Sequence, residues 1–241
     1  MLPVLAVVTS IEGTTTPLSF IRTVLFPFAR ARLPAFLQAH ADDPDVAGQV
    51  AEVRRLVPGQ PELQTLLHWM DRDAKIAPLK VLQGMVWREG YGEGELAGAV
   101  YADVPPALRR WSAAGLRLYC FSHGSTEAQR LIFGHTADGD LSGLFSAFFD
   151  TRIGSKREPE SFSRLAIGMG LPPAEIVYLS DVEAELDAAA TAGMRTCQVV
   201  RPGNDTRPGD RHPAAADFAG VAALLRLAGG DWSEAADQTA R

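Results

Sequence analysis

The sequence has little cysteine, no apolar run long enough for a membrane helix and no excess of basic residues. Its two cysteines, Cys120 and Cys197, fall in apolar runs that read as strands, which favours buried, reduced thiols over a disulfide. No window approaches the apolar length that a bilayer requires, and the N-terminus lacks the basic-then-apolar pattern of a secretion signal. The formal net charge of −6, with both signs interspersed, argues against a nucleic-acid surface. We expect a cytoplasmic protein without membrane or nucleic-acid partners.

Apolar material is plentiful, since 46% of the 241 residues are hydrophobic, enough for one large domain or a domain with an insertion. Helical patterns that stop at Gly170 and Gly193 are followed closely by short buried runs, which is typical of βαβ units. Such repeats predict an α/β fold with a parallel sheet covered by helices on both faces. The predicted strands span residues 2–8, 115–121, 146–150, 175–181 and 195–200.

Residues 17–111 break this rhythm, because their segments have helical spacing and contain no convincing strand. We interpret them as a helical subdomain inserted after the first strand, with residues 1–16 and 112–228 forming the core. Pro27 and Pro34 are expected to kink or divide the first inserted helix. The end of the chain, residues 229–241, is small and polar and is expected to fray.

Four polar stretches end or follow predicted strands, where ligands of open α/β sheets bind. A hydroxyl and backbone N–H groups at a helix N-terminus suit phosphate oxygens, and a lysine can neutralise a phosphoryl group. A carboxylate at such a strand end suits Mg²⁺, which takes one or two carboxylates together with waters and phosphate. In chain order the stretches are Ser10 to Thr14, Ser122 to Gly124, Lys156, and Asp181 with Glu183 and Glu185 behind it.

Each stretch taken alone has an ordinary structural alternative. Ser122 and Asp181 are also good helix N-caps, Lys156 resembles a solvated surface lysine, and Glu12 resembles an exposed loop residue. The histidines His123 and His135 are interpreted as packing or hydrogen-bonding residues, because no second metal ligand stands at helical spacing. All four stretches follow successive predicted strands, so their side chains can line one pocket. This order favours a single phosphate site over four unrelated structural roles.

Longer sequence blocks contain or surround the four polar stretches. In chain order they are "IEGTTTPLSFIRTVLFPFAR", "LKVLQGMVWREGY", "YADVPPALRRW", "GSTEAQRLIFGHTADGDLSGLF", "FFDTRIGSKRE", "YLSDVEAELDAA" and "VVRPGN". These ordered blocks resemble the enolase-phosphatase E1 (acireductone synthase) family of the haloacid dehalogenase (HAD) superfamily. The resemblance implies a HAD-type Rossmann-like core with an inserted all-helical cap after the first strand. It also implies a Mg²⁺-dependent hydrolase of methionine salvage that enolises and then dephosphorylates a small phosphorylated diketone.

Site roles follow from the resemblance residue by residue. Glu12 matches the general acid/base and places its backbone carbonyl on the metal, and Asp181 matches the metal-binding carboxylate. Ser122 and Lys156 match the phosphate-binding hydroxyl and cation, and the neighbouring His123 and Gly124 complete the phosphate- and substrate-binding set. A monomer is the expected state.

Two positions depart from the family pattern. The family has an aspartate at the position of Ser10, where it attacks phosphorus and binds Mg²⁺; a serine there predicts very slow phosphate release. His123 stands where the family has a small hydroxyl residue. A replaced nucleophile in an active parent and a serine native to a divergent relative are both compatible with the sequence. A non-catalytic phosphometabolite-binding protein and a HAD phosphatase for another phosphate ester are the alternative functions.

Overall fold

The computed structural model describes residues 3–227, so the predicted fraying tail at 229–241 lies outside the described residues. The chain divides into two compact units. The core unit consists of Met1–Leu18 with Gly98–Arg241, and the helical unit consists of Ser19–Ala97.

The core unit contains one parallel sheet in the order β3-β2-β1-β4-β5-β6, and the predicted α/β fold is confirmed. Five strands lie within a few residues of the predicted segments. The sixth, β6, was not predicted, because two residues carry no periodic signal. The strands are β1 Ala6–Thr9, β2 Arg117–Phe121, β3 Phe145–Phe149, β4 Ile176–Ser180, β5 Arg195–Val199 and β6 Ala214–Ala215.

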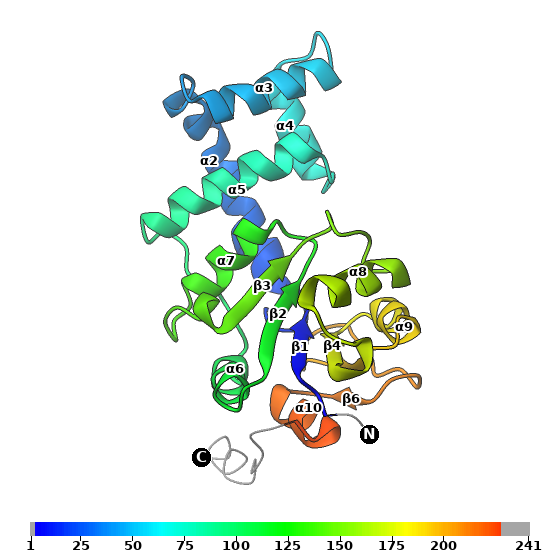
Figure 1. The fold of residues 1–241 in the computed structure, drawn as a ribbon. Coiled ribbons are helices and arrows are strands. Elements are labelled where there is room, and N and C mark those ends of the chain that lie inside the picture. Colours follow the sequence, from blue (N-terminus) through cyan, green and yellow to red (C-terminus); the bar gives the residue numbers. More distant parts are fainter. Residues whose placement is uncertain (1–2, 228–241) are drawn as a thin grey trace. The chain divides into compact units, whose positions relative to one another are not determined.

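Helices cover both faces of the sheet (Figure 1). Successive strand residues point to opposite faces, so one set of apolar side chains packs on α8 (Pro159–Met169) and α9 (Glu183–Thr191). The other side is covered by α6 (Val104–Ala113), α7 (Thr126–Gly134) and α10 (Phe218–Leu225), which contact β2, β3 and β5 respectively. The short helices η2 (Ser142–Leu144) and η3 (Pro173–Glu175) lead into β3 and β4.

The boundary at the end of the helical insertion differs from the predicted one. The helical unit ends at Ala97, whereas the sequence pattern placed its end at residue 111. The two boundaries differ because α6 packs on the core unit and not on the helical unit. Its Leu108 and Trp111 are buried there, and Trp111 stacks on Phe218 with 5.1 Å between ring centroids. Helical periodicity marks α6 as a helix but does not say which unit it packs on.

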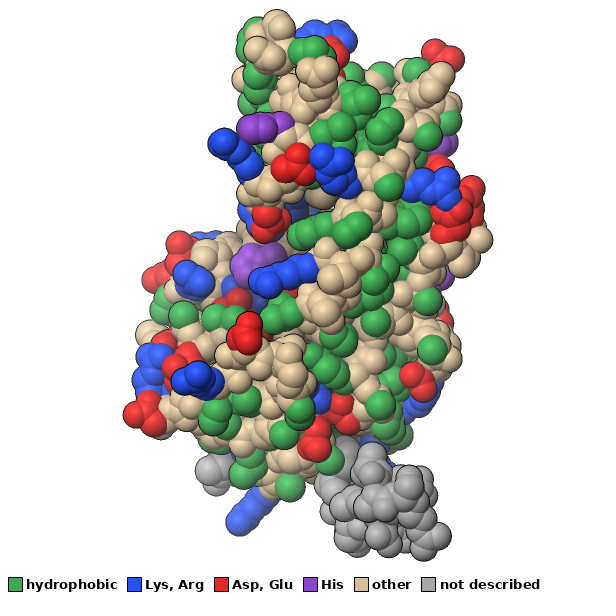
Figure 2. Space-filling model, turned by 180° about the vertical axis from the view of Figure 1, so that it is seen from behind, with side chains coloured by type: hydrophobic (Ala, Val, Ile, Leu, Met, Phe, Trp, Pro, Cys, Tyr) green, Lys and Arg blue, Asp and Glu red, His purple; other side chains and the backbone are tan. Residues whose placement is uncertain are grey.

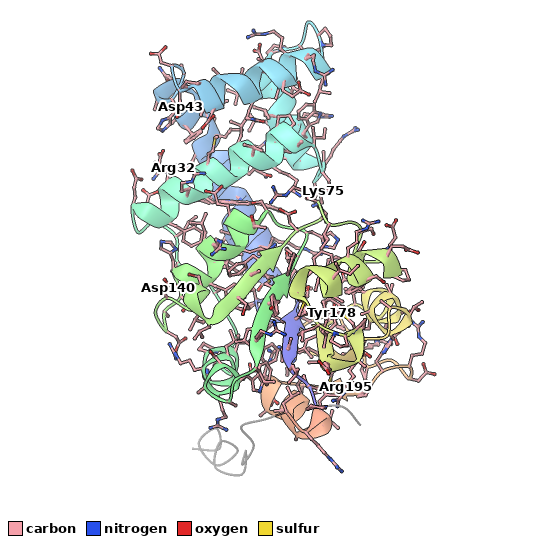
Figure 3. All side chains as sticks on the ribbon, in the orientation of Figure 1. Arg32, Asp43, Lys75, Asp140, Tyr178 and Arg195 are labelled. Carbon is pink, nitrogen blue, oxygen red and sulfur yellow. The ribbon has the colours of Figure 1, made fainter. Side chains whose placement is uncertain are left out.

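The helical unit is all helical and has its own apolar core. Residues on α2, α3, α4 and α5 supply that core, including Leu33, Val53, Leu66 and Leu82. Asp43 caps α3 by accepting a hydrogen bond from the backbone N–H of Asp45 at 2.8 Å (Figure 3). The bounds are α1 Leu18–Phe20, the π-helix η1 Ile21–Leu25, α2 Phe26–Ala39, α3 Pro44–Leu56, α4 Glu62–Asp71 and α5 Ala77–Gly92.

The two prolines of the first inserted segment behave differently from each other. The segment changes from π- to α-helix at Phe26, one residue before Pro27, so that proline stands in the first turn of α2. The prediction that Pro34 kinks or divides the helix is wrong as to division, because α2 continues through it to Ala39. Pro34 is exposed while Leu33 and Phe36 are buried, so packing on the opposite side compensates for the missing hydrogen bond.

Charged side chains of both signs are interspersed on the face drawn in Figure 2. Several form exposed ion pairs within the helical unit, such as Arg30 with Asp71 at 2.8 Å and Arg54 with Glu62 at 2.6 Å. Water and salt screen exposed pairs of this kind, so they contribute little and the unit depends on its apolar core for stability. Within residues 3–227, no helix combines the length and apolarity needed to cross a membrane.

Candidate active site

The sheet register brings three of the predicted site residues to neighbouring strand ends. Thr9 on β1 pairs with Cys120 on β2 and with Leu179 on β4. Ser10, Ser122 and Asp181 therefore follow the carboxyl ends of three adjacent parallel strands. The strand order reverses between β1 and β4, which is where open α/β sheets bind ligands.

Lys156, from the loop after β3, reaches the end of β1. Its Nζ donates a hydrogen bond to Ser10 Oγ at 2.8 Å and forms an ion pair with Glu185 Oε2 at 2.8 Å. The lysine and glutamate side chains are 1% and 5% exposed. The alternative interpretation of Lys156 as a solvated surface lysine is therefore wrong. Glu185, grouped with Asp181 in the sequence, is instead the counter-ion of this lysine.

The carboxylate of Glu185 is held by further hydrogen bonds inside the core. Tyr178 Oη and Ser180 Oγ each donate to Glu185 Oε2 at 2.8 Å, and Figure 3 labels Tyr178 among the core side chains. Burial alone would raise the pKa of Glu185, but the charge of Lys156 and the three hydrogen bonds outweigh it and lower that pKa. The ionised Glu185 carboxylate thus stands as the counter-ion of Lys156 beside Ser10.

Glu12 and Ser122 lie against each other. Ser122 Oγ donates to the Glu12 carboxylate, at 3.1 Å from Oε2 and 3.3 Å from Oε1, and accepts a hydrogen bond from Gly124 N at 3.1 Å. The helix that follows is capped by Ser125, whose side chain accepts from Ala128 N, so Ser122 is not its N-cap. His123 is exposed in the same turn.

Asp181 is surrounded by hydroxyl groups. Thr14 Oγ1 donates to Asp181 Oδ1 and Thr206 Oγ1 to Oδ2, both at 3.4 Å, and Asp181 N donates to Thr14 Oγ1 at 3.1 Å. Burial raises the pKa of Asp181 above its ordinary value. The site therefore holds a desolvated carboxylate that a cation would stabilise.

Comparisons with known proteins show the family of this chain. The family model of haloacid dehalogenase-like hydrolases matches residues 13–193. The protein named enolase-phosphatase E1 from Granulibacter bethesdensis is 53% identical over 228 residues, covering 94% of this chain and 99% of that one. The chain belongs to the enolase-phosphatase E1 family. A relative of the same name from Gluconacetobacter diazotrophicus is 54% identical over 222 residues, covering 92% of this chain and 94% of its own length.

Solved structures share the fold of this chain. The UTR4 protein of Saccharomyces cerevisiae superposes with a TM-score of 0.79 at 31% identity, covering 89% of this chain and 98% of that one. A HAD phosphatase from Thermococcus onnurineus, at 17% identity and a TM-score of 0.60, shares the fold over 93% of this chain and 99% of its own. The predicted resemblance to enolase-phosphatase E1 is confirmed.

The metal expected in this enolase-phosphatase family can be tested against the residues present. Ser10 Oγ, the Glu12 carbonyl and the Asp181 carboxylate are all oxygen donors, which suits a hard cation such as Mg²⁺. Residues 3–227 contain no group of three His, Cys, Asp or Glu side chains that could hold a metal. A single carboxylate is within what Mg²⁺ accepts when waters and a phosphate supply the rest. The donor set therefore fits the ion, and it would hold it more weakly than a set with two carboxylates.

Gly13 lies closely against the carboxylate of Asp181. Its φ is +72°, and a Cβ built on it would stand 2.3 Å from Asp181 Oδ2. A Gly13→Ala variant is expected to lose about 1–2 kcal/mol of unfolding free energy from the left-handed backbone, and more from displacing Asp181. Urea denaturation measures the loss. Gly203→Ala is the matched control, because Gly203 has φ +84° with nothing within 4 Å; equal losses in both variants would contradict the steric part.

Three groups of contacts around the site escaped the sequence analysis. The hydroxyls of Tyr178 and Ser180 donate hydrogen bonds to Glu185, and the hydroxyl of Thr206 donates one to Asp181. Arg201 donates one to the backbone of the loop after β1. Arg201 carried a usable signal, because it lies two residues after the end of β5 and so stands at the same edge of the sheet as the predicted residues. Thr206 carried none, since a threonine in a polar loop is ordinary.

Proposed function

We propose that this chain is an enolase-phosphatase whose substrate is 2,3-diketo-5-methylthiopentyl-1-phosphate and whose products are 1,2-dihydroxy-3-keto-5-methylthiopentene and phosphate. We further propose that Ser10 makes its phosphate-release step slow. The observation that carries the proposal is the meeting of Lys156, Ser10, Ser122 and Asp181 at adjacent strand ends. Family membership with relatives named enolase-phosphatase E1 supports the choice of reaction.

The proposed roles follow from the contacts. The Lys156 ammonium binds and neutralises phosphoryl oxygens, and Ser122 Oγ, held by a hydrogen bond from Gly124 N, donates a hydrogen bond to them. Asp181, the Glu12 carbonyl and Ser10 would hold Mg²⁺, which when bound draws negative charge from the phosphoryl group. The Glu12 carboxylate must leave Ser122 when phosphate takes that hydroxyl, and it is then free to move a proton on the substrate.

Ser10 is poorly placed to act as a nucleophile itself. Its Oγ accepts a hydrogen bond from Lys156, and an ammonium paired with Glu185 has no lone pair to take the serine proton. Any phosphoserine formed would be a stable monoester, whereas the acyl phosphate of an aspartate hydrolyses readily. Replacing Ser10 by aspartate and assaying phosphate release tests the proposal, and the absence of activity in that variant would contradict it for this substrate.

Enolisation is expected to survive in part in the Ser10 protein, because proton transfer by Glu12 does not use the nucleophile. Incubation with the diketone phosphate should produce the ultraviolet absorbance of an enol without release of phosphate. Glu12→Gln should reduce that rate by about 10²-fold or more, since a positioned acid/base contributes 10²–10⁴-fold. Glu158→Gln is the matched control, because Glu158 lies outside this set of contacts at the start of α8. Equal enol formation by both variants would remove Glu12 from the mechanism.

The alternative function, a phosphometabolite-binding protein without turnover, is favoured by one feature only. Ser10 leaves the phosphate-binding donors in place while removing the nucleophile. Binding of phosphorylated metabolites by the Ser10 protein, together with no activity after its replacement by aspartate, would support that alternative. A screen of other phosphate esters with the aspartate variant tests the second alternative, a phosphatase of different specificity. That alternative predicts faster phosphate release from another ester than from the diketone phosphate.

A further inference from the structure

Three consecutive backbone carbonyls in the loop after β1 are each held by a donor from a distant part of the core unit. Two donors come from the segment that follows β5, and the third is a backbone N–H just before α6. The amides of the same loop bond back to Ile11 and Thr16. The loop that carries Glu12 is thus fixed from both sides of its backbone. The pairs are Asn204 Nδ2 with Gly13 O at 3.3 Å, Arg201 Nε with Thr14 O at 2.8 Å, and Tyr101 N with Thr15 O at 2.9 Å.

Arg201 is the most strongly fixed of these donors. It is 3% exposed, and its Nη1 lies 2.8 Å from both carboxylate oxygens of Asp103. Its guanidinium stands 4.3 Å from the ring centroid of Tyr101 and 5.1 Å from that of Phe218, while Asp103 Oδ2 also accepts from Phe218 N at 2.8 Å. A planar guanidinium held by a carboxylate and two rings keeps its Nε pointing at one place, the carbonyl of Thr14.

We propose that Arg201, with Asp103 as its counter-ion, is a positioning residue for the reaction. By fixing the carbonyl of Thr14, it orients the loop after β1. That orientation sets the hydrogen bond between Thr14 Oγ1 and Asp181 and the one between Glu12 and Ser122. A shift of about 1 Å in groups of this kind can cost about 10²-fold in rate. Only the effect on turnover rests on the proposed function; the effect on the loop does not.

Arg201→Lys tests the effect on the loop. Lysine keeps the charge opposite Asp103 but lacks the planar fork that also reaches Thr14 O. Amide hydrogen exchange in residues 11–16 of this variant is expected to accelerate about 10-fold or more, with little change in unfolding temperature. Arg195→Lys is the matched control, because Arg195 starts the same strand and its Nη2 bonds Leu225 O at 3.0 Å, away from the loop (Figure 3). Acceleration spread equally over α6 and α10, or none in residues 11–16, would overturn the proposal.

Kinetics in a Ser10→Asp background test the effect on turnover. Arg201→Lys is expected to lower kcat about 10²-fold with little change in KM, while Arg195→Lys leaves both unchanged. Unchanged kcat in an active Ser10→Asp/Arg201→Lys protein would overturn the positioning role. If Ser10→Asp alone is inactive, the proposed function has failed, and the exchange measurement still tests whether Arg201 fixes the loop.

Discussion

Replacing Ser10 by aspartate is expected to raise Mg²⁺-dependent phosphate release from the diketone phosphate by on the order of 10⁴-fold or more. Loss of a catalytic nucleophile in other enzymes costs rate factors of this size and larger. The aspartate carboxylate would form a bond to phosphorus as the P–O ester bond breaks, and the departing oxygen of the organic product would take a proton from Glu12. Water would then hydrolyse the acyl phosphate, releasing phosphate and restoring the carboxylate. The new carboxylate also adds a second anionic ligand for the metal beside Asp181.

The surroundings of Ser10 are suited to a carboxylate. Lys156 Nζ lies 2.8 Å from Ser10 Oγ and offers a cation to a buried anion at this position. Phosphate release is measured with Mg²⁺ and with a chelator, because activity that survives chelation would contradict the metal's role. Ser10→Asn is the matched control, since it has the shape of aspartate without a nucleophilic carboxylate. Equal activity in Ser10→Asn and Ser10→Asp would contradict nucleophilic attack by residue 10.

Replacing Lys156 by methionine is expected to cost about 3–5 kcal/mol of unfolding free energy near pH 7. The change removes one member of a buried ion pair whose side chains are 1% and 5% exposed and leaves Glu185 as an uncompensated charge. The hydrogen bonds from Tyr178 and Ser180 remain but do not replace the cation. Urea denaturation of the variant and the parent measures the difference.

The pH dependence of that loss has a definite sign. In the unmodified protein, folding lowers the pKa of Glu185. The stability that this carboxylate contributes is therefore fully present above its unfolded pKa of about 4.3, and it is lost as pH falls through the folded pKa. In Lys156→Met, burial without the cation raises the pKa of Glu185, so the carboxyl is neutral at pH 4 and the deficit shrinks there. Lys156→Met/Glu185→Gln should recover most of the loss at pH 7. A deficit that is the same at pH 4 and pH 7 would contradict the ion-pair explanation.

The strands and the four site stretches could be predicted from the sequence because both depend on local patterns. Buried strands read as short apolar runs, and parallel strands put their carboxyl ends at one edge, so Ser10, Ser122 and Asp181 were expected together. The family resemblance added the inserted helical cap and the expected aspartate at position 10. The unit to which α6 belongs was not predictable in this way, because an apolar stripe at helical spacing does not identify the surface on which the helix packs. The stacking of Trp111 on Phe218 does.

By itself, the sequence determined the α/β class, the family and the absence of a carboxylate at position 10, since each is carried by residue types in a fixed order. The tertiary structure alone decided that Glu185 pairs with Lys156 rather than joining Asp181, and that Arg201 holds the loop after β1. Partners 29 and 187 residues apart in the chain leave no periodic trace in the sequence. Burial determines which groups pair, because a charge removed from water is stable only beside a counter-ion, and the fold brings few such groups close to it.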